Sequence, residues 1–213
     1  MSIKLIHGDC MDYMRGLPDN AFELAIVDPP YGIETRGNAQ DRFRAGMQLS
    51  TANDLKPTKE YFDELFRVSK NQIIWGYNWL SDMLPKCREF IFWYKKQPVI
   101  TFADGELAWS SFQRTAKCLE FPYYEATIAN KKSGKIHPTQ KPIKLYDWLL
   151  SNYAKPGDRI LDTHLGSGSS AIAAHYAGHD FVGIELDEDY FKAASKRVDN
   201  ETRQVDIFAE ASQ

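Results

Sequence analysis

The feature that most constrains the fold of this chain is a strand–turn–helix–strand pattern in residues 159–185. Two short apolar strands flank a glycine-rich turn and a helix of small residues, which is the order of a parallel βαβ unit. Alternation of this kind predicts an α/β fold with a mainly parallel sheet. The expected elements are a strand over 159–162, a turn over 165–169, a helix over 170–177 and a strand over 180–184.

The turn of this unit has the composition of a nucleoside-binding loop. Gly166 and Gly168 let the backbone approach a ligand closely and adopt positive φ angles. The turn also lies at a helix N-terminus, where backbone amides and the helix dipole favour a carboxylate or phosphate. Glu185 follows Gly166 by 19 residues, and an acid about 20 residues after such a loop typically binds ribose hydroxyls. The third glycine of the dinucleotide fingerprint is missing, so the loop fits any nucleotide or S-adenosylmethionine protein.

The rest of the chain continues the alternation, and 213 residues of which 43% are hydrophobic can bury one substantial core. We therefore predict a single domain, residues 1–213, with a mainly parallel twisted sheet and helices on both of its faces. The strand over 89–94 is expected to be buried. The other strands are expected over 4–7, 22–27 and 72–75, an antiparallel part over 106–110 and 123–128, and helices over 11–15, 58–69, 142–153 and 187–198.

A second motif, Asp28-Pro29-Pro30-Tyr31, directly follows the apolar run 24–27. The Asp28 carboxylate and the Pro29 carbonyl can both accept hydrogen bonds, and neither proline offers a competing backbone donor. An exocyclic amine has two protons to donate, and Tyr31 offers a flat face on which a nucleobase can stack. The motif therefore favours the amino group of a flipped-out base, although a turn after a buried strand is the alternative explanation.

Together these motifs resemble those of the amino-group DNA methyltransferases, which methylate N6 of adenine or N4 of cytosine. The motif order, with Asp-Pro-Pro-Tyr first, resembles the permuted group of that family. The segment from Asp162 to Ser169 is similar to the family's Asp-x-Phe-x-Gly-Ser-Gly-Thr loop, with Thr163-His164 in place of Pro-Phe and Ser169 in place of Thr. Further similar segments are His137-Pro-Thr-Gln-Lys-Pro142, and Gly8-Asp9-Cys10 before Leu17-Pro18-Asp19-Asn20.

The resemblance implies an S-adenosylmethionine-dependent methyltransferase of Rossmann-like fold that acts on DNA. Asp28, Pro29, Pro30 and Tyr31 would be the catalytic residues. Within the cofactor site, the methionine part would lie along the glycine-rich loop, the ribose at Glu185, the adenine near the N-terminal segment, and the carboxylate at residues 139 and 141. The expected cofactor-binding residues are Asp9, Cys10, His137, Thr139, Lys141, Asp162, Leu165, Gly166, Ser167, Gly168, Ser169 and Glu185.

The chain has a net charge of −3, but its charged side chains are unevenly distributed along the sequence. Residues 86–144 carry 11 basic and 5 acidic side chains, a net charge of +6, whereas the flanking thirds are negative. A basic region with interleaved aromatic residues suits DNA, although an uneven solvated surface is the alternative. We predict a lid over 33–57, although the same residues suit a surface loop with no role, and a short DNA-contact region over 95–132. The expected DNA-binding side chains are Arg36, Arg42, Arg44, Lys95, Lys96, Arg114, Lys117, Lys131 and Lys132.

Among substrates, the Asp-Pro-Pro-Tyr form usually accompanies adenine in the family, so N6-adenine is the predicted target. N4-cytosine stays open because both amines offer the same two protons. Methylation of RNA or of a glutamine amide is disfavoured by Asp28, since the related enzymes carry asparagine there. A non-catalytic DNA-binding regulator is a further alternative, and the intact Asp28, Tyr31, Gly166, Gly168 and Glu185 argue against it. Because little of the chain is left for a recognition domain, we expect weak or short sequence specificity.

Other features limit the cellular context. Three scattered cysteines form no Cys-x-x-Cys pair, so reduced thiols are expected. His175 and His179 are separated by the helix-ending Gly178, and no acid completes a zinc set, so no metal site is expected. The chain lacks an apolar stretch of 18 residues and a signal-peptide core, which predicts a cytoplasmic prokaryotic or phage protein without a membrane partner. A homodimer and a paired restriction nuclease stay open.

Overall fold

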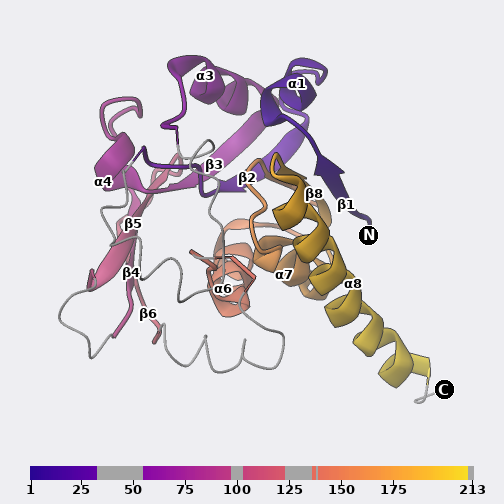
Figure 1. Cartoon of the computed structure of the whole chain (residues 1–213). Helices are drawn as coiled ribbons and strands as arrows, with labels where there is room; N and C mark the ends of the chain where they lie inside the picture. The colour runs from indigo at the N-terminus through magenta and orange to yellow at the C-terminus, as the bar shows by residue number, and fades with distance from the viewer. Residues whose placement is uncertain (33–54, 97–102, 123–135, 138, 211–213) are drawn as a thin grey trace, which may run out of the picture.

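A central sheet of eight strands organises the chain in the computed structural model, which describes residues 1–32, 55–96, 103–122, 136–137 and 139–210 (Figure 1). The order across the sheet is β1-β8-β7-β2-β3-β5-β4-β6. The strands are β1 (Ile3–His7), β2 (Phe22–Val27), β3 (Ser69–Trp75), β4 (Phe90–Tyr94), β5 (Gly105–Ser110), β6 (Lys117–Glu120), β7 (Arg159–Asp162) and β8 (Asp180–Glu185). The helices are α1 (Cys10–Arg15), α3 (Lys59–Val68), α4 (Tyr77–Leu80), α6 (Ile143–Tyr153), α7 (Ser169–Ala177) and α8 (Glu188–Glu210).

The sheet has a parallel part and a mixed part. Strands β1, β8, β7, β2 and β3 are parallel to one another. Strand β5 runs antiparallel to β3 and β4, and β6 pairs parallel with β4 at the edge. The prediction of a mainly parallel α/β sheet is therefore confirmed, as is the antiparallel strand expected over 106–110.

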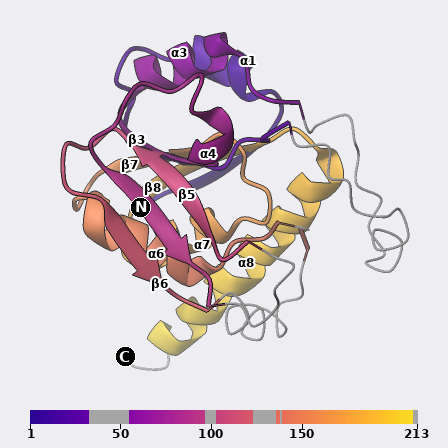
Figure 2. The ribbon, with the colours of Figure 1, turned by 90° about the vertical axis from the view of Figure 1, so that its left-hand side faces the viewer.

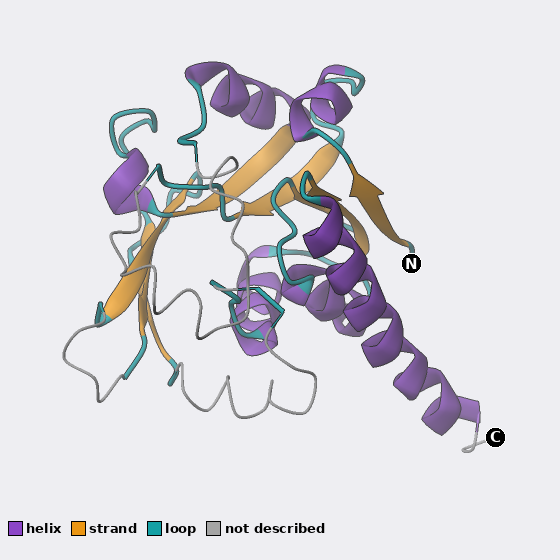
Figure 3. Ribbon diagram, in the orientation of Figure 1, coloured by secondary structure: helices purple, strands orange, loops and turns teal. Residues whose placement is uncertain are grey.

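Strand β2 is buried on both faces from Leu24 to Val27, which explains the continuous apolar run over these four residues. Leu24 and Ile26 belong to a core cluster with residues of α6, α7 and α8, whereas Ala25 and Val27 belong to a cluster with residues of α1, α3 and α4. Successive side chains of a strand point to opposite faces, so the two clusters lie on the two sides of the sheet. Figures 2 and 3 show these layers, with α1 and α3 on one side and α6, α7 and α8 on the other.

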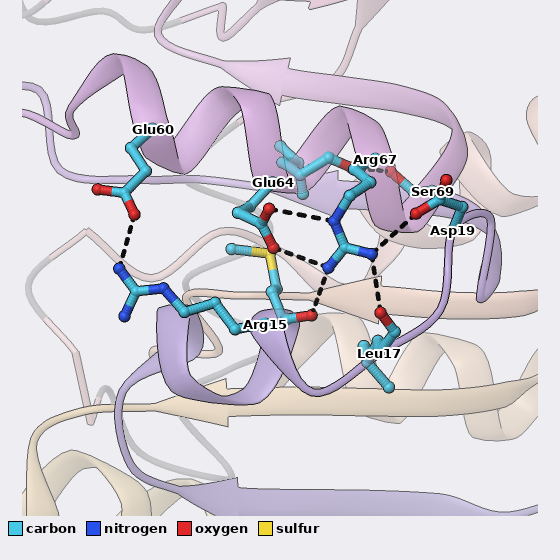
Figure 4. Close-up of polar contacts among 9 residues, drawn as sticks. Arg15, Leu17, Asp19, Glu60, Glu64, Arg67 and Ser69 are labelled. Atoms are coloured by element: carbon cyan, nitrogen blue, oxygen red, sulfur yellow. Dashed lines mark hydrogen bonds and ion pairs between the residues drawn. The ribbon is translucent and has the colours of Figure 1, made fainter.

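Arg67 of α3 fixes the connection between α1 and β2 (Figure 4). Its guanidinium donates to the carbonyl oxygens of Met14 and Leu17, at 2.9 and 2.8 Å, and pairs with Glu64 and Asp19. The Met14 carbonyl lies in the last turn of α1 and the Leu17 carbonyl lies just after it, at the helix end where carbonyl groups lack partners within the helix. The contacts tie α1 to α3, and α1 begins directly after Asp9 at the candidate site.

Several expected elements differ from the observed ones. Strand β6 was not expected, and the strand expected over 123–128 lies outside the described residues. The strand expected to be buried, β4, is buried on one face only, since Phe90 and Tyr94 are exposed. Helix α8 continues to Glu210, beyond its expected end at Val198, because residues 199–210 include neither glycine nor proline.

Candidate active site

Four acidic residues end or follow neighbouring parallel strands at one edge of the sheet. Asp28 follows β2, Asp162 ends β7, Glu185 ends β8 and Asp9 lies two residues after β1. Ala25 pairs with Leu161, and His7 pairs with Glu185. Ligands of open α/β sheets bind at the carboxyl ends of the strands, so the topology brings both sequence motifs to one place.

The Asp28 carboxylate already receives two hydrogen-bond donors. The Tyr31 hydroxyl donates to Oδ1, and the Lys141 ammonium donates to Oδ2. Burial raises the pKa of the Tyr31 hydroxyl well above its ordinary value, and the charge of Asp28 adds to this shift. Because a carboxylate has about four lone-pair positions, Asp28 can still accept from a further donor.

The ring of Tyr31 packs against the backbone of Gly76, directly after β3. A Cβ atom built on Gly76 would lie 2.1 Å from the tyrosine ring, and Gly76 has a φ of +81°. Only glycine meets both conditions without strain. The predicted stacking residue is therefore held from behind by a backbone segment that sequence reasoning did not single out.

Lys141 is the second residue that holds Asp28. Its side chain is 5% exposed, and its Nζ lies 3.2 Å from Oε2 of Glu106. The Lys95 ammonium pairs with the other oxygen of Glu106. Burial lowers the pKa of Lys141, but the charges of Asp28 and Glu106 outweigh it and raise the pKa overall. The structure thus places Lys141 on the Asp28 carboxylate, whereas its expected contact with a cofactor carboxylate stays a prediction.

Asp162 anchors the glycine-rich loop. Its Oδ1 accepts from the His164 amide at 3.0 Å, and its Oδ2 accepts from the Ser170 hydroxyl at 2.6 Å. The residue is 1% exposed, and burial raises its pKa to about 7. One oxygen thus bonds to the start of the loop and the other to the first turn of α7, so the observed role of Asp162 is to hold the two ends of that loop together.

The loop itself approaches Glu185 and His137. The Gly166 amide donates to Glu185 Oε2 at 2.8 Å, and the Asp187 amide donates to Oε1 at 3.0 Å. A Cβ atom built on Gly166 would lie 3.8 Å from the His137 ring. His137 also contacts Thr139, whose Oγ1 lies 3.1 Å from its Nδ1. The structure therefore brings three of the predicted cofactor segments together.

Arg197 of α8 holds the glycine-rich loop in place through hydrogen bonds, and the sequence motifs did not identify it. Its Nη1 donates to the Ser167 carbonyl at 2.8 Å and to the Ser169 hydroxyl at 2.9 Å, and the residue is 4% exposed. Leu165 is also buried, and its side chain lies against Gly183 of β8. These contacts hold the loop between α8 and the sheet.

The unusual pair Thr163-His164 forms a hydrogen-bonded chain with Tyr61 of α3. The Tyr61 hydroxyl lies 2.7 Å from Thr163 Oγ1, which lies 2.9 Å from His164 Nδ1. Burial lowers the pKa of His164 to about 4. The imidazole is therefore neutral near pH 7, and its ring packs on Tyr61 where the family's usual phenylalanine would stand.

The N-terminal segment places one acid and one thiol beside Glu185. Asp9 caps α1 by accepting from the Met11 amide at 2.7 Å, and the Gly8 amide donates to the Glu185 carbonyl at 2.9 Å. Burial, with the charges of Asp9 and Glu185, raises the pKa of Cys10 to about 12. Cys10 is thus a protonated thiol packed against the core rather than a nucleophile.

Of the four predicted DNA-binding side chains that the structure describes, only one reaches this edge. Lys95 does, but it is 12% exposed and pairs with Glu106, so it is not the free surface cation that its sequence context indicated. Lys96 pairs with Glu120. Arg114 donates to the Asn152 carbonyl, at the opposite end of α6 from Lys141, and Lys117 starts the edge strand β6. Arg36, Arg42, Arg44, Lys131 and Lys132 lie outside the described residues.

Strands β5 and β6 lie within the region predicted over 95–132 for DNA contact, so part of it belongs to the sheet. The lid predicted over 33–57 lies mostly outside the described residues. Within the described part of the chain, no group of three His, Cys, Asp or Glu side chains could hold a metal ion. The described helices include none that is long and apolar enough to cross a membrane.

Comparisons with known proteins agree with this geometry. Residues 51–196 match the model of the DNA methylase family. YubD of Escherichia coli K12 is 26% identical over 209 residues, which cover 92% of this chain and 89% of that protein. The type II methyltransferase M.HinfI of Haemophilus influenzae is 22% identical over 91% of this chain and 67% of that protein. TTHA0409 of Thermus thermophilus, complexed with S-adenosyl-L-methionine, has a TM-score of 0.59 and 20% identity, covering 93% of this chain and 95% of that one.

Proposed function

Because the chain belongs to the DNA methylase family, we propose that it methylates the N6 amine of a flipped-out adenine in DNA. Family membership establishes the coarser statement that the protein is an S-adenosylmethionine-dependent, site-specific DNA methyltransferase. The family resemblance of the sequence motifs is confirmed at that level. The permuted group and the choice of adenine stay predictions, since the family covers both N6 and N4 enzymes and the matched span begins after Tyr31.

One observation carries the proposal: Asp28 and the glycine-rich loop follow adjacent parallel strands, β2 and β7. The register between Ala25 and Leu161 brings the two motifs to the same edge of the sheet. A methyl acceptor held by Asp28 would therefore lie next to a nucleoside held by the loop. Such an arrangement allows transfer between two bound reactants, for which positioning supplies much of the rate enhancement.

The residues at this edge fit the cofactor. Acidic groups gather there, with Asp9 and Glu185 on adjacent strand ends, and carboxylates can accept from ribose hydroxyls and attract a sulfonium or ammonium group. The backbone of Gly166 lies open beside His137, since a Cβ atom there would meet only ordinary contacts. When bound, S-adenosylmethionine supplies an electrophilic methyl group on a positively charged sulfur. We assign the ribose to Glu185 and the amino-acid end to the segment His137–Lys141 and the loop.

Asp28 and Pro29 act on the target amine in this proposal. Its nitrogen is a weak nucleophile because the lone pair is delocalised into the base. Hydrogen bonds from the two N–H groups to the Asp28 carboxylate and the Pro29 carbonyl would localise that lone pair and direct it. During methyl transfer the nitrogen would gain positive charge and then release one proton to water, and the Asp28 carboxylate would stabilise that charge.

Extrusion of the base from the duplex costs a few kcal/mol, and Tyr31 would offset part of this by stacking. The polar segment 33–57 as a lid, and basic side chains of 95–132 as phosphate contacts, remain part of the proposal. Cytosine N4 is the second candidate, because its amine offers Asp28 the same two protons as adenine N6. A silent regulator would bind cofactor and DNA without turnover.

Nucleoside mass spectrometry tests the proposal. The purified protein is incubated with S-adenosylmethionine and unmethylated DNA, and the DNA is then digested to nucleosides. N6-methyladenine is expected from the wild type, and its loss from Asp28→Ala. The control Asp63→Asn, which removes an exposed carboxylate paired with Lys59 on α3, should keep full activity. N4-methylcytosine would overturn the choice of base, and cofactor binding without any product would favour the regulator.

A further inference from the structure

Glu106 lies behind the catalytic carboxylate, although no motif in the sequence includes it. Strand β5 runs antiparallel to β3, so its first residues lie at the edge where β2 and β3 end. The ammonium of Lys141 is placed between Asp28 and Glu106, in contact with Asp28 Oδ2 and 3.2 Å from Glu106 Oε2. Lys95 closes the row on the far side of Glu106. Charges therefore alternate along Asp28, Lys141, Glu106 and Lys95.

The row of four charges is largely buried and sums to zero. The side chains of Lys141, Lys95, Asp28 and Glu106 are 5%, 12%, 18% and 28% exposed. Burial raises the pKa of Glu106, but the charges of Lys141 and Lys95 outweigh it and lower the pKa overall. Because an unpaired buried charge is strongly destabilising, removing any one of the four must change the electrostatics of the others.

Aromatic rings restrict where the two ammonium groups can move. Lys141 Nζ lies 5.4 Å from the centre of the Trp75 ring, and Lys95 Nζ lies 5.2 Å from that of Trp93. Both indoles are fully buried. The cations are therefore held by ring faces as well as by carboxylates, which makes the row a fixed arrangement rather than an adjustable surface ion pair.

We propose that Glu106 is a positioning residue for methyl transfer: by sharing the Lys141 ammonium, it preserves the negative potential of Asp28 toward the target amine. The inference rests on the proposed function of Asp28. If Lys141 had Asp28 as its sole counter-charge, the two would cancel, and little field would remain to stabilise positive charge on the nitrogen. Glu106 supplies a second negative charge beside the Lys141 ammonium, and Lys95 in turn supplies a positive charge beside Glu106.

Single-turnover kinetics with saturating DNA and cofactor isolate the chemical step and test this role. In Glu106→Gln, the rate constant should fall at least tenfold, while the Kd for S-adenosylmethionine stays within about threefold of wild type. The double variant Glu106→Gln/Lys95→Gln restores zero net charge, so it should regain at least threefold over the single variant. Glu106→Asp keeps the charge, so it should retain more activity than Glu106→Gln.

A control separates this effect from a general loss of negative charge. Glu120, the last residue of β6, has an exposed carboxylate that pairs with Lys96. Glu120→Gln removes this carboxylate and should leave the rate constant unchanged. An unchanged rate in Glu106→Gln, loss of cofactor affinity in step with the rate, or a double variant slower than the single one would each overturn the proposal. If Glu106→Gln does not fold, the electrically neutral double variant Glu106→Gln/Lys95→Gln takes its place, and wild-type cofactor affinity with no loss of rate in that variant would likewise overturn the proposal. A wild type that methylates neither base would instead contradict the proposed function.

Discussion

The hydroxyl of Tyr31 donates a hydrogen bond to Oδ1 of Asp28, three residues earlier in the chain. The residue expected to stack on the target base is thus joined to the residue expected to hold its amine. Gly76 packs behind the tyrosine ring, and Lys141 takes the other oxygen of Asp28. The side of the site that we propose binds the base is therefore already organised in the free protein, and the two proposed functions of Tyr31 can be separated by substitution.

Tyr31→Phe and Tyr31→Ala should differ mainly in DNA binding. Phenylalanine keeps the ring, so the KM for DNA should stay within about threefold of wild type. Alanine also removes the stacking surface, which is worth about 1–3 kcal/mol per base, so KM should rise about tenfold. Steady-state methylation of an oligonucleotide measures both values. Equal KM values for the two variants would contradict a stacking role for the ring.

Asp162 should make stability depend on pH. Burial raises its pKa from 3.8 to about 7, so between these values the folded state holds a proton that the unfolded state releases. Its contribution to stability is greatest below about pH 4 and falls as the pH rises to about 7. Asp162→Asn removes this titration, so the wild type should lose about 2 kcal/mol relative to the variant between pH 5 and pH 8.

Urea unfolding of both proteins at the two pH values measures this difference. The control Asp63→Asn replaces an exposed carboxylate on α3, and its free energy of unfolding should follow that of the wild type at both pH values. If the difference in unfolding free energy between wild type and Asp162→Asn were the same at both pH values, Asp162 would be ionised throughout this range.

The sequence predicted the site where its parts are local. The strands before Asp28 and Asp162 are short apolar runs with ordinary boundaries, and parallel strands place their carboxyl ends at one edge. The Gly-x-Gly pattern of Gly166 and Gly168 indicates a tight turn from the local sequence alone, and both residues have positive φ angles in the structure. These residues could be assigned before the tertiary structure was known.

Residues that act through long-range packing could not be predicted in this way. Glu106 reaches Lys141 only because β5 inserts between β3 and β4 with reversed direction. Arg197 reaches the loop only because α8 packs against it, and a lone arginine on a helix carries no local signal. A charge count treats Lys95 as a surface cation. It cannot show that Tyr94 pairs with Gly105 across two strands, which brings the next residue, Lys95, to Glu106.

His164→Phe, which restores the family's usual residue, should stabilise the protein at acid pH. The folded state lowers the pKa of His164 from 6.5 to about 4, so the unfolded state binds a proton more readily between these values. The contribution of His164 to stability is therefore lost as the pH falls from about 6.5 to about 4. Relative to wild type, the variant should gain up to about 2 kcal/mol on going from pH 7 to pH 5, measured by urea unfolding.

Alanine substitutions at two glycines with nearly the same φ angle can distinguish the cost of backbone strain from the cost of a packing clash. Gly168 and Gly178 have φ angles of +75° and +77°, so alanine costs about 1 kcal/mol of strain at either position. A Cβ atom at Gly168 would also lie 2.8 Å from Val198 Cγ2, whereas at Gly178 it would meet no atom of the described residues within 4 Å. Gly168→Ala should therefore lose at least a further 1 kcal/mol of unfolding free energy. Gly168→Ala should also weaken cofactor binding, because the added methyl group would push α8 away from the loop that Arg197 holds. Equal losses of unfolding free energy in the two alanine variants would show that α8 accommodates this methyl group without cost.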